Sequence, residues 1–212
     1  MILLTSARLP DSLSRHALSA TVRLLFPNEG NREYFEGIDK RADLPATESL
    51  FALTLLYDQI RMLPTAIDTA KLVFARSELG KPYFVDSPVK FNVSHSKGYV
   101  AVAVSLGEEL GVDVEATALP RERAVKMAER YFGADEQKIV QNDAKSFSRL
   151  WSEKEAKAKF LGESIGNLLS IEKKSDFSGD FDNLKLHRFK IDDFPITLCT
   201  KRDFSTITFT VQ

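Results

Sequence analysis

Two carboxylates stand two residues apart in the short apolar segment GVDVE at 111–115. Side chains alternate along a strand, so Asp113 and Glu115 share one face while the two valines anchor the other face in the core. Neighbouring carboxylates repel each other, and either water or a shared cation relieves that repulsion. For this pair alone, two solvated acids at an exposed strand end are the favoured interpretation, and a bound cation is the alternative.

A second group of chemically useful residues lies in the segment WSEKEAKAKF at 151–160. Trp151, Glu155 and Lys159 follow one another at helical spacing of four and therefore share a face. Taken alone, Glu155 and Lys159 are most simply an ordinary surface ion pair worth about 0.2–0.5 kcal/mol. The segment adjoins an apolar stripe, however, which places both side chains at the edge of a core.

Hydrogen-bond donors gather in the segment FNVSHS at 91–96, which has the pattern of a strand followed by a polar turn. Asn92, Ser94, His95 and Ser96 together suit the oxygens of a phosphate group. The alternative is a polar turn with a satisfied histidine, and for a lone histidine that alternative is favoured. Upstream, GKP at 80–82 indicates a turn that carries one cation, Lys81.

Elements on both sides must position these residues. In the first half the pattern predicts a helix after a cap at Asp11, a loop at 27–40, a buried helix at 48–62 and strands at 71–75, 91–93 and 99–106. The pattern then restarts with a strand at 111–115, a helix from Pro120 to Gly133, and a helix at 144–161 that Asn142 or Asp143 caps and Gly162 ends. Runs at 184–191, 196–201 and 206–211 predict an antiparallel meander. Helices and strands in each half indicate an α+β fold with a join near 106–110.

Composition narrows the class of protein. The chain has 212 residues, 43% of them hydrophobic, so it is long enough to bury a hydrophobic core. Its net charge of −1 produces no overall positive potential that would attract nucleic acid. Its one cysteine, Cys199, excludes an intrachain disulfide and a cysteine-based zinc site. No apolar run approaches the about 18 residues of a membrane span, and none is typical of a signal sequence. We therefore expect a cytoplasmic protein that binds neither nucleic acid nor membrane.

Read in order, four motifs resemble the 4′-phosphopantetheinyl transferases: GKP at 80–82, FNVSHS at 91–96, GVDVE at 111–115 and WSEKEAxxK at 151–159. Their spacing and the chain length resemble the double-length, surfactin-synthetase type. The resemblance extends from about residue 74 to residue 170. It implies two similar α+β halves in a pseudo-twofold arrangement, here 1–106 and 107–212, with the active site in the cleft between them and most of the metal and catalytic residues in the second half.

The resemblance also implies an activity. The family transfers the phosphopantetheine arm of coenzyme A to a serine of an acyl, peptidyl or aryl carrier protein and releases adenosine 3′,5′-bisphosphate. Positions matching the family's Mg²⁺ ligands are Asp113, Glu115 and Glu155. Glu155 would also accept the serine proton, directly or through a metal-bound water, and Lys159 would neutralise the leaving phosphate.

Other positions match family residues around coenzyme A. The coenzyme A contacts implied by the match are Lys81, Ser94, His95, Lys154 and Lys159. Glu136 matches an acidic position that tunes the site, with Asp135 as another register. Family members place basic residues near the N-terminus on the 3′-phosphate, yet 48–60 contains no arginine or lysine, and Lys40, Arg41 and Arg61 are the candidate substitutes.

Carrier domains are acidic around the modified serine, so a basic helix face is expected to receive one. The candidates are Arg121, Arg123, Lys126 and Arg130, although such a set is more often a solvated face. A chain with both halves completes its site alone, which implies a monomer. The alternatives are a non-catalytic relative that binds coenzyme A or a carrier protein, and a Mg²⁺-dependent hydrolase of nucleotide pyrophosphates.

Overall fold

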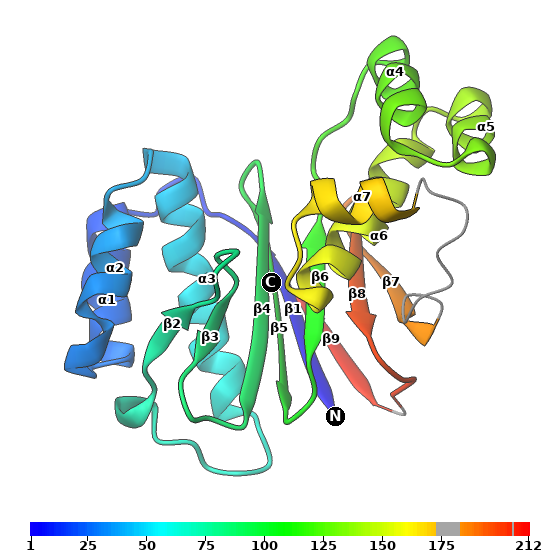
Figure 1. The fold of residues 1–212 in the computed structure, drawn as a ribbon. Coiled ribbons are helices and arrows are strands. Elements are labelled where there is room, and N and C mark those ends of the chain that lie inside the picture. Colours follow the sequence, from blue (N-terminus) through cyan, green and yellow to red (C-terminus); the bar gives the residue numbers. More distant parts are fainter. Residues whose placement is uncertain (173–182, 205) are drawn as a thin grey trace.

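The computed structural model describes residues 1–172, 183–204 and 206–212, which form a mixed α+β fold (Figure 1). Its helices are α1 (Arg15–Leu25), α2 (Arg32–Asp39), α3 (Asp43–Arg61), α4 (Arg121–Tyr131), α5 (Ala134–Asn142), α6 (Ser146–Leu161) and α7 (Ile165–Glu172). Its strands are β1 (Ile2–Arg8), β2 (Phe74–Arg76), β3 (Pro82–Phe84), β4 (Val89–Ser96), β5 (Tyr99–Leu106), β6 (Leu110–Val114), β7 (Lys185–Ile191), β8 (Phe194–Thr200) and β9 (Ile207–Val211). The predicted α+β class is thus confirmed.

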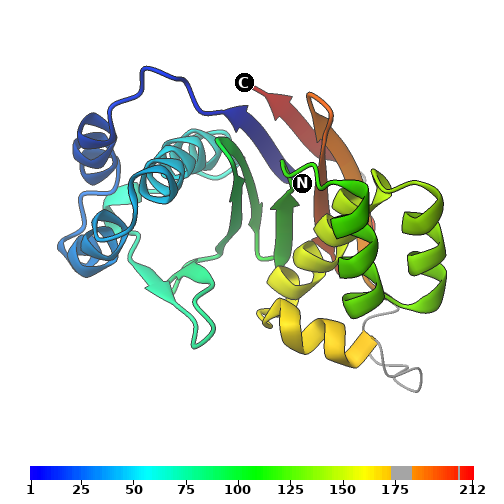
Figure 2. The same ribbon diagram turned by 90° about the horizontal axis from the view of Figure 1, so that it is seen from above.

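Two sheets form the centre of the molecule. One has the strand order β4-β5-β1-β9, the other has the order β6-β8-β7, and β2 pairs with β3 in a separate hairpin. Helix α3 packs on β5, β4 and β1, whereas α6 packs on β6 and β8. Figure 2 shows the result from above, with α1–α3 on one side of the sheets and α4–α7 on the other. The two motif-bearing elements β4 and β6 meet where the sheets adjoin.

The C-terminal meander was predicted wrongly in its last strand. β7 and β8 pair antiparallel as expected, but β9 runs parallel to β1 in the other sheet. The reason is that β8 lies between β6 and β7, so both of its edges are already hydrogen-bonded. β9 therefore takes the free edge of β1, and a strand from the expected second half completes the sheet of the first.

Several helix boundaries also differ from the prediction. The expected loop at 27–40 contains a 3₁₀ turn (Glu29–Asn31) and α2, whose apolar residues Phe35 and Ile38 are buried. Helix α1 begins after Ser14, which accepts a hydrogen bond from the Ala17 amide, rather than after Asp11. Helix α3 begins five residues before Glu48, and α5 and α7 were not predicted.

Helix α6 ends at Gly162 as predicted, but it begins at Ser146, two residues later than expected, and its N-cap position is Lys145, whose side chain makes no capping hydrogen bond. The Asp143 carboxylate accepts hydrogen bonds from the Lys145 amide at 3.1 Å and the Ser146 hydroxyl at 3.0 Å, which satisfies donors at the start of the helix. Gly162 ends it with a φ of 70°, in the left-handed region that favours glycine. These local signals fix the register that places Trp151, Glu155 and Lys159 on one face.

Polar side chains join β4 to β6 where a backbone ladder is missing. The bonds run from Val112 N to Asn92 Oδ1 (2.8 Å), from Val114 N to Ser94 Oγ (3.2 Å) and from Ala116 N to Ser96 Oγ (3.1 Å). Alternate residues of FNVSHS therefore face β6, because side chains alternate along a strand. His95, between them, faces α3 instead. The motif holds the two carboxylate-bearing positions beside β4.

Gly111 permits the close approach of α6 to β6. A Cβ at this position would lie 2.2 Å from the carbonyl oxygen of Ala156 and 2.4 Å from the amide nitrogen of Phe160, both backbone atoms. The absence of a side chain thus lets the helix bring Glu155 and Lys159 to the carboxylate strand.

Gly111→Ala is expected to lower the free energy of unfolding by about 3 kcal/mol or more, because the helix must move away from the strand. Chemical denaturation measures this loss. Gly166→Ala is the matched control, since a Cβ there meets no atom within 4 Å. Equal stability of the two variants would contradict the close-packing account.

Candidate active site

A cavity of about 350 Å³ opens where β4, β6 and α6 meet. Its lining consists of Val93, Ser94, His95, Ser96, Asp113, Val114, Glu115, Trp151, Glu155 and Lys159. Three motifs that are remote from one another in sequence therefore share one cavity. Asp113 and Glu115 share one face of their strand, as predicted. The prediction that Trp151, Glu155 and Lys159 share one helix face is confirmed as well.

Asp113 is the centre of the cavity's hydrogen-bond network. The residue is 5% exposed, and its Oδ1 accepts from Lys159 Nζ at 2.7 Å and from the Ser94 hydroxyl at 2.9 Å. Lys159 Nζ also lies 2.9 Å from Ser94 Oγ, so the three side chains form a closed triangle. The interpretation of Asp113 as a solvated acid at a strand end is thus wrong, because the serine of β4 and the lysine of α6 cover it.

The other two carboxylates are half-buried at the same cavity. Glu115 Oε1 accepts from the Thr117 amide at 2.8 Å and from the Ser96 hydroxyl at 3.4 Å. Burial raises the pKa of Glu155, the Lys159 ammonium opposes that rise, and the negative charges of Asp113 and Glu115 add to it. The three acids therefore repel one another across the cavity.

The donor set fits a divalent cation. Asp113 Oδ2 is buried and has no hydrogen-bond partner among the described residues. An orphaned carboxylate oxygen beside two more carboxylates offers the hard oxygen ligands that Mg²⁺ prefers. No three His, Cys, Asp or Glu side chains in the described part of the chain are already gathered as a metal cluster. A cation would therefore draw these carboxylates together and relieve their repulsion.

Lys81 lies beside the site. It lines an adjoining cavity of about 240 Å³, which shares Val93 and Lys159 with the first. Its ammonium lies 3.3 Å from Glu109 Oε2 and donates to the carbonyls of Leu110 and Phe160. Burial lowers the pKa of Lys81, and Glu109 opposes the shift. Lys81 thus ties the ends of β6 and α6 together next to the cavity.

Lys154 does not line the cavity, although it was predicted to contact coenzyme A. Its side chain is buried, 2.9 Å from Glu136 Oε1 and 5.3 Å from the centre of the Phe132 ring. Glu136 Oε2 also accepts from the Gly133 amide at 3.1 Å and so starts α5. This pair joins α5 to α6, and the contact of Lys154 with coenzyme A stays a prediction.

The first half contributes cations near His95. A cavity of about 120 Å³ shares Val93 and His95 with the main cavity and is also lined by Tyr34, Arg41 and Arg76. Burial and the positive charge of Arg76 lower the pKa of Arg41, so an anion between them would be stabilised. Of the three sequence candidates only Arg41 lies here, because Arg61 stacks on Tyr57 and Lys40 is not among the lining residues.

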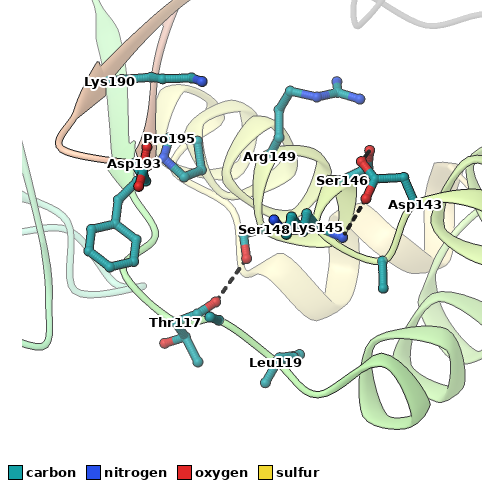
Figure 3. A pocket seen from close by; sticks show the side chains of 13 residues that line it. Thr117, Leu119, Asp143, Lys145, Ser146, Ser148, Arg149, Lys190, Asp193 and Pro195 are labelled. Atoms are coloured by element: carbon teal, nitrogen blue, oxygen red, sulfur yellow. Dashed lines mark hydrogen bonds between the residues drawn. The ribbon is translucent and has the colours of Figure 1, made fainter.

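A larger cavity of about 510 Å³ lies beside the start of α6 (Figure 3). The Ser148 hydroxyl donates to the Thr117 carbonyl at 2.8 Å across it, and Lys145, Arg149 and Lys190 contribute cations. Its two acids are Asp143, which accepts a hydrogen bond from the Ser146 hydroxyl, and Asp193. Among the residues that the structure describes, this larger cavity has neither a carboxylate cluster nor an orphaned carboxylate oxygen. The smaller cavity with Asp113 is therefore the stronger candidate for an active site.

Two residues of the site neighbourhood were missed in the sequence. Glu48 is buried against His95, and Arg76 faces Arg41. The signal for Glu48 is an acid that directly precedes the almost entirely apolar run at 49–57. Arg76 had no comparable signal, because its place beside Arg41 depends on contacts between remote segments.

Residues 109–209, which carry Asp113, Glu115, Glu155 and Lys159, match the family model of the 4′-phosphopantetheinyl transferase superfamily. The predicted resemblance to this family is thereby confirmed, and the double-length type stays a prediction. The chain is 35% identical over 104 residues to the 4′-phosphopantetheinyl transferase gsp of Aneurinibacillus migulanus, covering 47% of this chain and 42% of that protein. It is 30% identical over 115 residues to HetI of Nostoc, also named a 4′-phosphopantetheinyl transferase, covering 50% and 48% of the two chains.

A third relative is matched over more of its length. The chain is 28% identical over 141 residues to the 4′-phosphopantetheinyl transferase AcpT of Escherichia coli, covering 64% of this chain and 69% of that protein. Against gsp and HetI, in contrast, the alignment spans only about half of the relative's length. In the described part of the chain, no helix has the length and apolar character needed to cross a membrane.

Proposed function

We propose that this chain is a phosphopantetheinyl transferase of the double-length type that converts an apo carrier protein to its holo form with coenzyme A as the donor. The observation that supports this proposal most is the shared cavity of Asp113, Glu115, Glu155 and Lys159, on a segment that matches the superfamily. The cavity lies between β4 of the expected first half and β6 and α6 of the expected second half, as a cleft between two halves requires.

In the proposed reaction, the serine oxygen of the carrier attacks the phosphorus that bears the pantetheine arm. The bond from that phosphorus to the bridging oxygen breaks, and adenosine 3′,5′-bisphosphate leaves. Glu155 accepts the serine proton, because its carboxylate lines the cavity where the serine would enter. The Lys159 ammonium neutralises the charge that develops on the leaving phosphate.

Asp113, Glu115 and Glu155 would hold a Mg²⁺ ion. When bound, such an ion neutralises phosphate charge and polarises the phosphorus for attack. Ser94 keeps both Asp113 and Lys159 in place through its 2.9 Å contacts, so that neither side chain rotates away from the cavity. Lys81 extends the positive potential along the rim toward the nucleotide, and His95 lies on the same rim.

The 3′-phosphate of coenzyme A is proposed to lie between Arg41 and Arg76. Arg41→Ala is expected to weaken coenzyme A binding about tenfold, because a hydrogen bond to a charged group is lost. The same variant should bind 3′-dephospho-coenzyme A as wild type does. Calorimetry with both ligands tests this, and Arg61→Ala is the control because Arg61 stacks on Tyr57 away from the cavity. Equal losses for the two ligands would contradict the assignment.

The carrier protein is proposed to approach over α4. Arg121, Arg123, Lys126 and Arg130 are all exposed on this helix and can face an acidic carrier surface. With both halves of the site in one chain, we propose that the protein acts as a monomer in the cytoplasm.

A nucleotide-release assay separates this proposal from its alternatives. The protein is incubated with coenzyme A and Mg²⁺, with and without an apo carrier protein, and adenosine 3′,5′-bisphosphate is measured. A transferase releases the bisphosphate only when the carrier is present. Release without a carrier would indicate a hydrolase of nucleotide pyrophosphates. Binding of coenzyme A with no release across several carrier classes would indicate a non-catalytic relative.

A further inference from the structure

His95 lies where two cavities meet, and a buried carboxylate holds its ring. The ring lines both the main cavity and the cavity with Arg41 and Arg76. Glu48 of α3 is 3% exposed, and its Oε2 lies 2.9 Å from His95 Nδ1. A carboxylate only accepts hydrogen bonds, so the proton of this bond is on Nδ1.

Glu48 is itself fixed from a second side. Its Oε1 accepts from the Gly98 amide at 2.5 Å. Gly98 has a φ of 84° and Lys97 a φ of 48°, in the turn that joins β4 to β5. With one oxygen bonded to the turn and the other to the ring, the carboxylate has a single orientation.

The other ring nitrogen, Nε2, is a donor only when the ring carries a second proton. The Ser49 hydroxyl donates its only proton to the Pro45 carbonyl at 2.7 Å and accepts from Arg41 Nη1 at 3.0 Å. Toward His95 Nε2, which is 3.5 Å away, the serine oxygen can therefore only accept. That contact is long, so Nε2–H can form a shorter bond with a ligand oxygen.

We propose that Glu48 is a positioning residue that fixes the His95 ring through Nδ1 and turns Nε2 toward a phosphate group of coenzyme A, so that both ring nitrogens are protonated when the phosphate is bound. This inference rests on the proposed function. Burial and the nearby charges of Lys159 and Arg41 lower the pKa of His95, and the Glu48 carboxylate opposes that shift. A hydrogen bond from a charged donor is stronger than one from a neutral donor, so a protonated His95 would bind the phosphate more tightly.

A double-mutant cycle on coenzyme A binding tests the inference. Glu48→Gln keeps an oxygen for the Gly98 amide but removes the charge from His95. Glu48→Gln and His95→Ala are each expected to weaken coenzyme A binding about tenfold by calorimetry, and the double variant no more than His95→Ala alone. Asp43→Asn is the control, since Asp43 is an exposed acid at the start of the same helix. Unchanged binding by Glu48→Gln, or additive losses, would overturn the inference.

Nitrogen-15 spectra of the His95 ring add a readout that needs no variant. With coenzyme A bound, wild type should show both ring nitrogens protonated, whereas a neutral ring would overturn the inference. If wild type binds coenzyme A and Glu48→Gln binds it equally well, only the role of Glu48 fails. If wild type does not bind coenzyme A, the proposed function fails together with this inference.

Discussion

Asp113→Asn is expected to lower the rate of phosphopantetheine transfer by about 10³-fold while the fold is retained. The amide has the same shape and can still accept from Lys159 or Ser94 with its one oxygen, so the packing of β6 survives. What it loses is the negative charge and the orphaned oxygen, Oδ2, that are proposed to bind the cation. Steady-state assays at saturating coenzyme A measure the loss.

Asp58→Asn is the matched control, because Asp58 is an exposed carboxylate on α3 away from the cavity. Its rate should equal that of wild type. Circular dichroism and thermal unfolding of both variants separate a chemical loss from a folding loss. Transfer by Asp113→Asn within about threefold of wild type would refute the metal-site assignment, since removal of a catalytic charge has larger effects.

Glu155→Gln is the second variant with a large expected effect. Loss of a general base costs about 10²–10⁴-fold in the catalytic rate. Glu155 also shares the proposed cation, so the affinity for Mg²⁺ should fall along with the rate. A titration of activity against Mg²⁺ therefore separates the loss of proton transfer from the loss of Mg²⁺ affinity. Saturating Mg²⁺ compensates for the weaker affinity but not for the missing proton acceptor. Glu78→Gln, at an exposed acid outside the cavity, is the control.

An unchanged catalytic rate for Glu155→Gln at saturating Mg²⁺ would contradict the proton-acceptor role. A rate restored fully by excess Mg²⁺ would assign Glu155 to the cation alone. The physical basis for the expected loss is the place of the Glu155 carboxylate in the cavity beside Asp113, Glu115 and Lys159.

Local patterns predicted the parts of the site that single elements determine. The spacing of Trp151, Glu155 and Lys159 fixed their common helix face, and the alternation in GVDVE fixed that of Asp113 and Glu115. Both faces line the cavity. The glycine signal predicted the C-terminal limit of α6, since such a signal acts over a few residues, whereas the predicted cap at Asn142 or Asp143 placed the start of the helix too early.

Features that depend on remote contacts were not predictable in the same way. The pairing of β9 with β1 depends on which sheet edge is free, and no pattern within 207–211 indicates it. Asp113 is buried rather than solvated because Ser94 and Lys159, each far away in sequence, contact it. Likewise, no local pattern indicated that Asn92, Ser94 and Ser96 accept hydrogen bonds from backbone amides within or just after β6, and their contact with phosphate oxygens stays a prediction.

Intact-mass spectrometry of an apo carrier protein tests the central proposal most directly. The carrier is incubated with this protein, coenzyme A and Mg²⁺, and a parallel sample contains EDTA. A mass gain of one phosphopantetheine group, absent with EDTA and with Asp113→Asn, is the expected result. An unmodified carrier in every class tested, with coenzyme A bound by the wild-type protein, would contradict the transferase function and leave a binding protein.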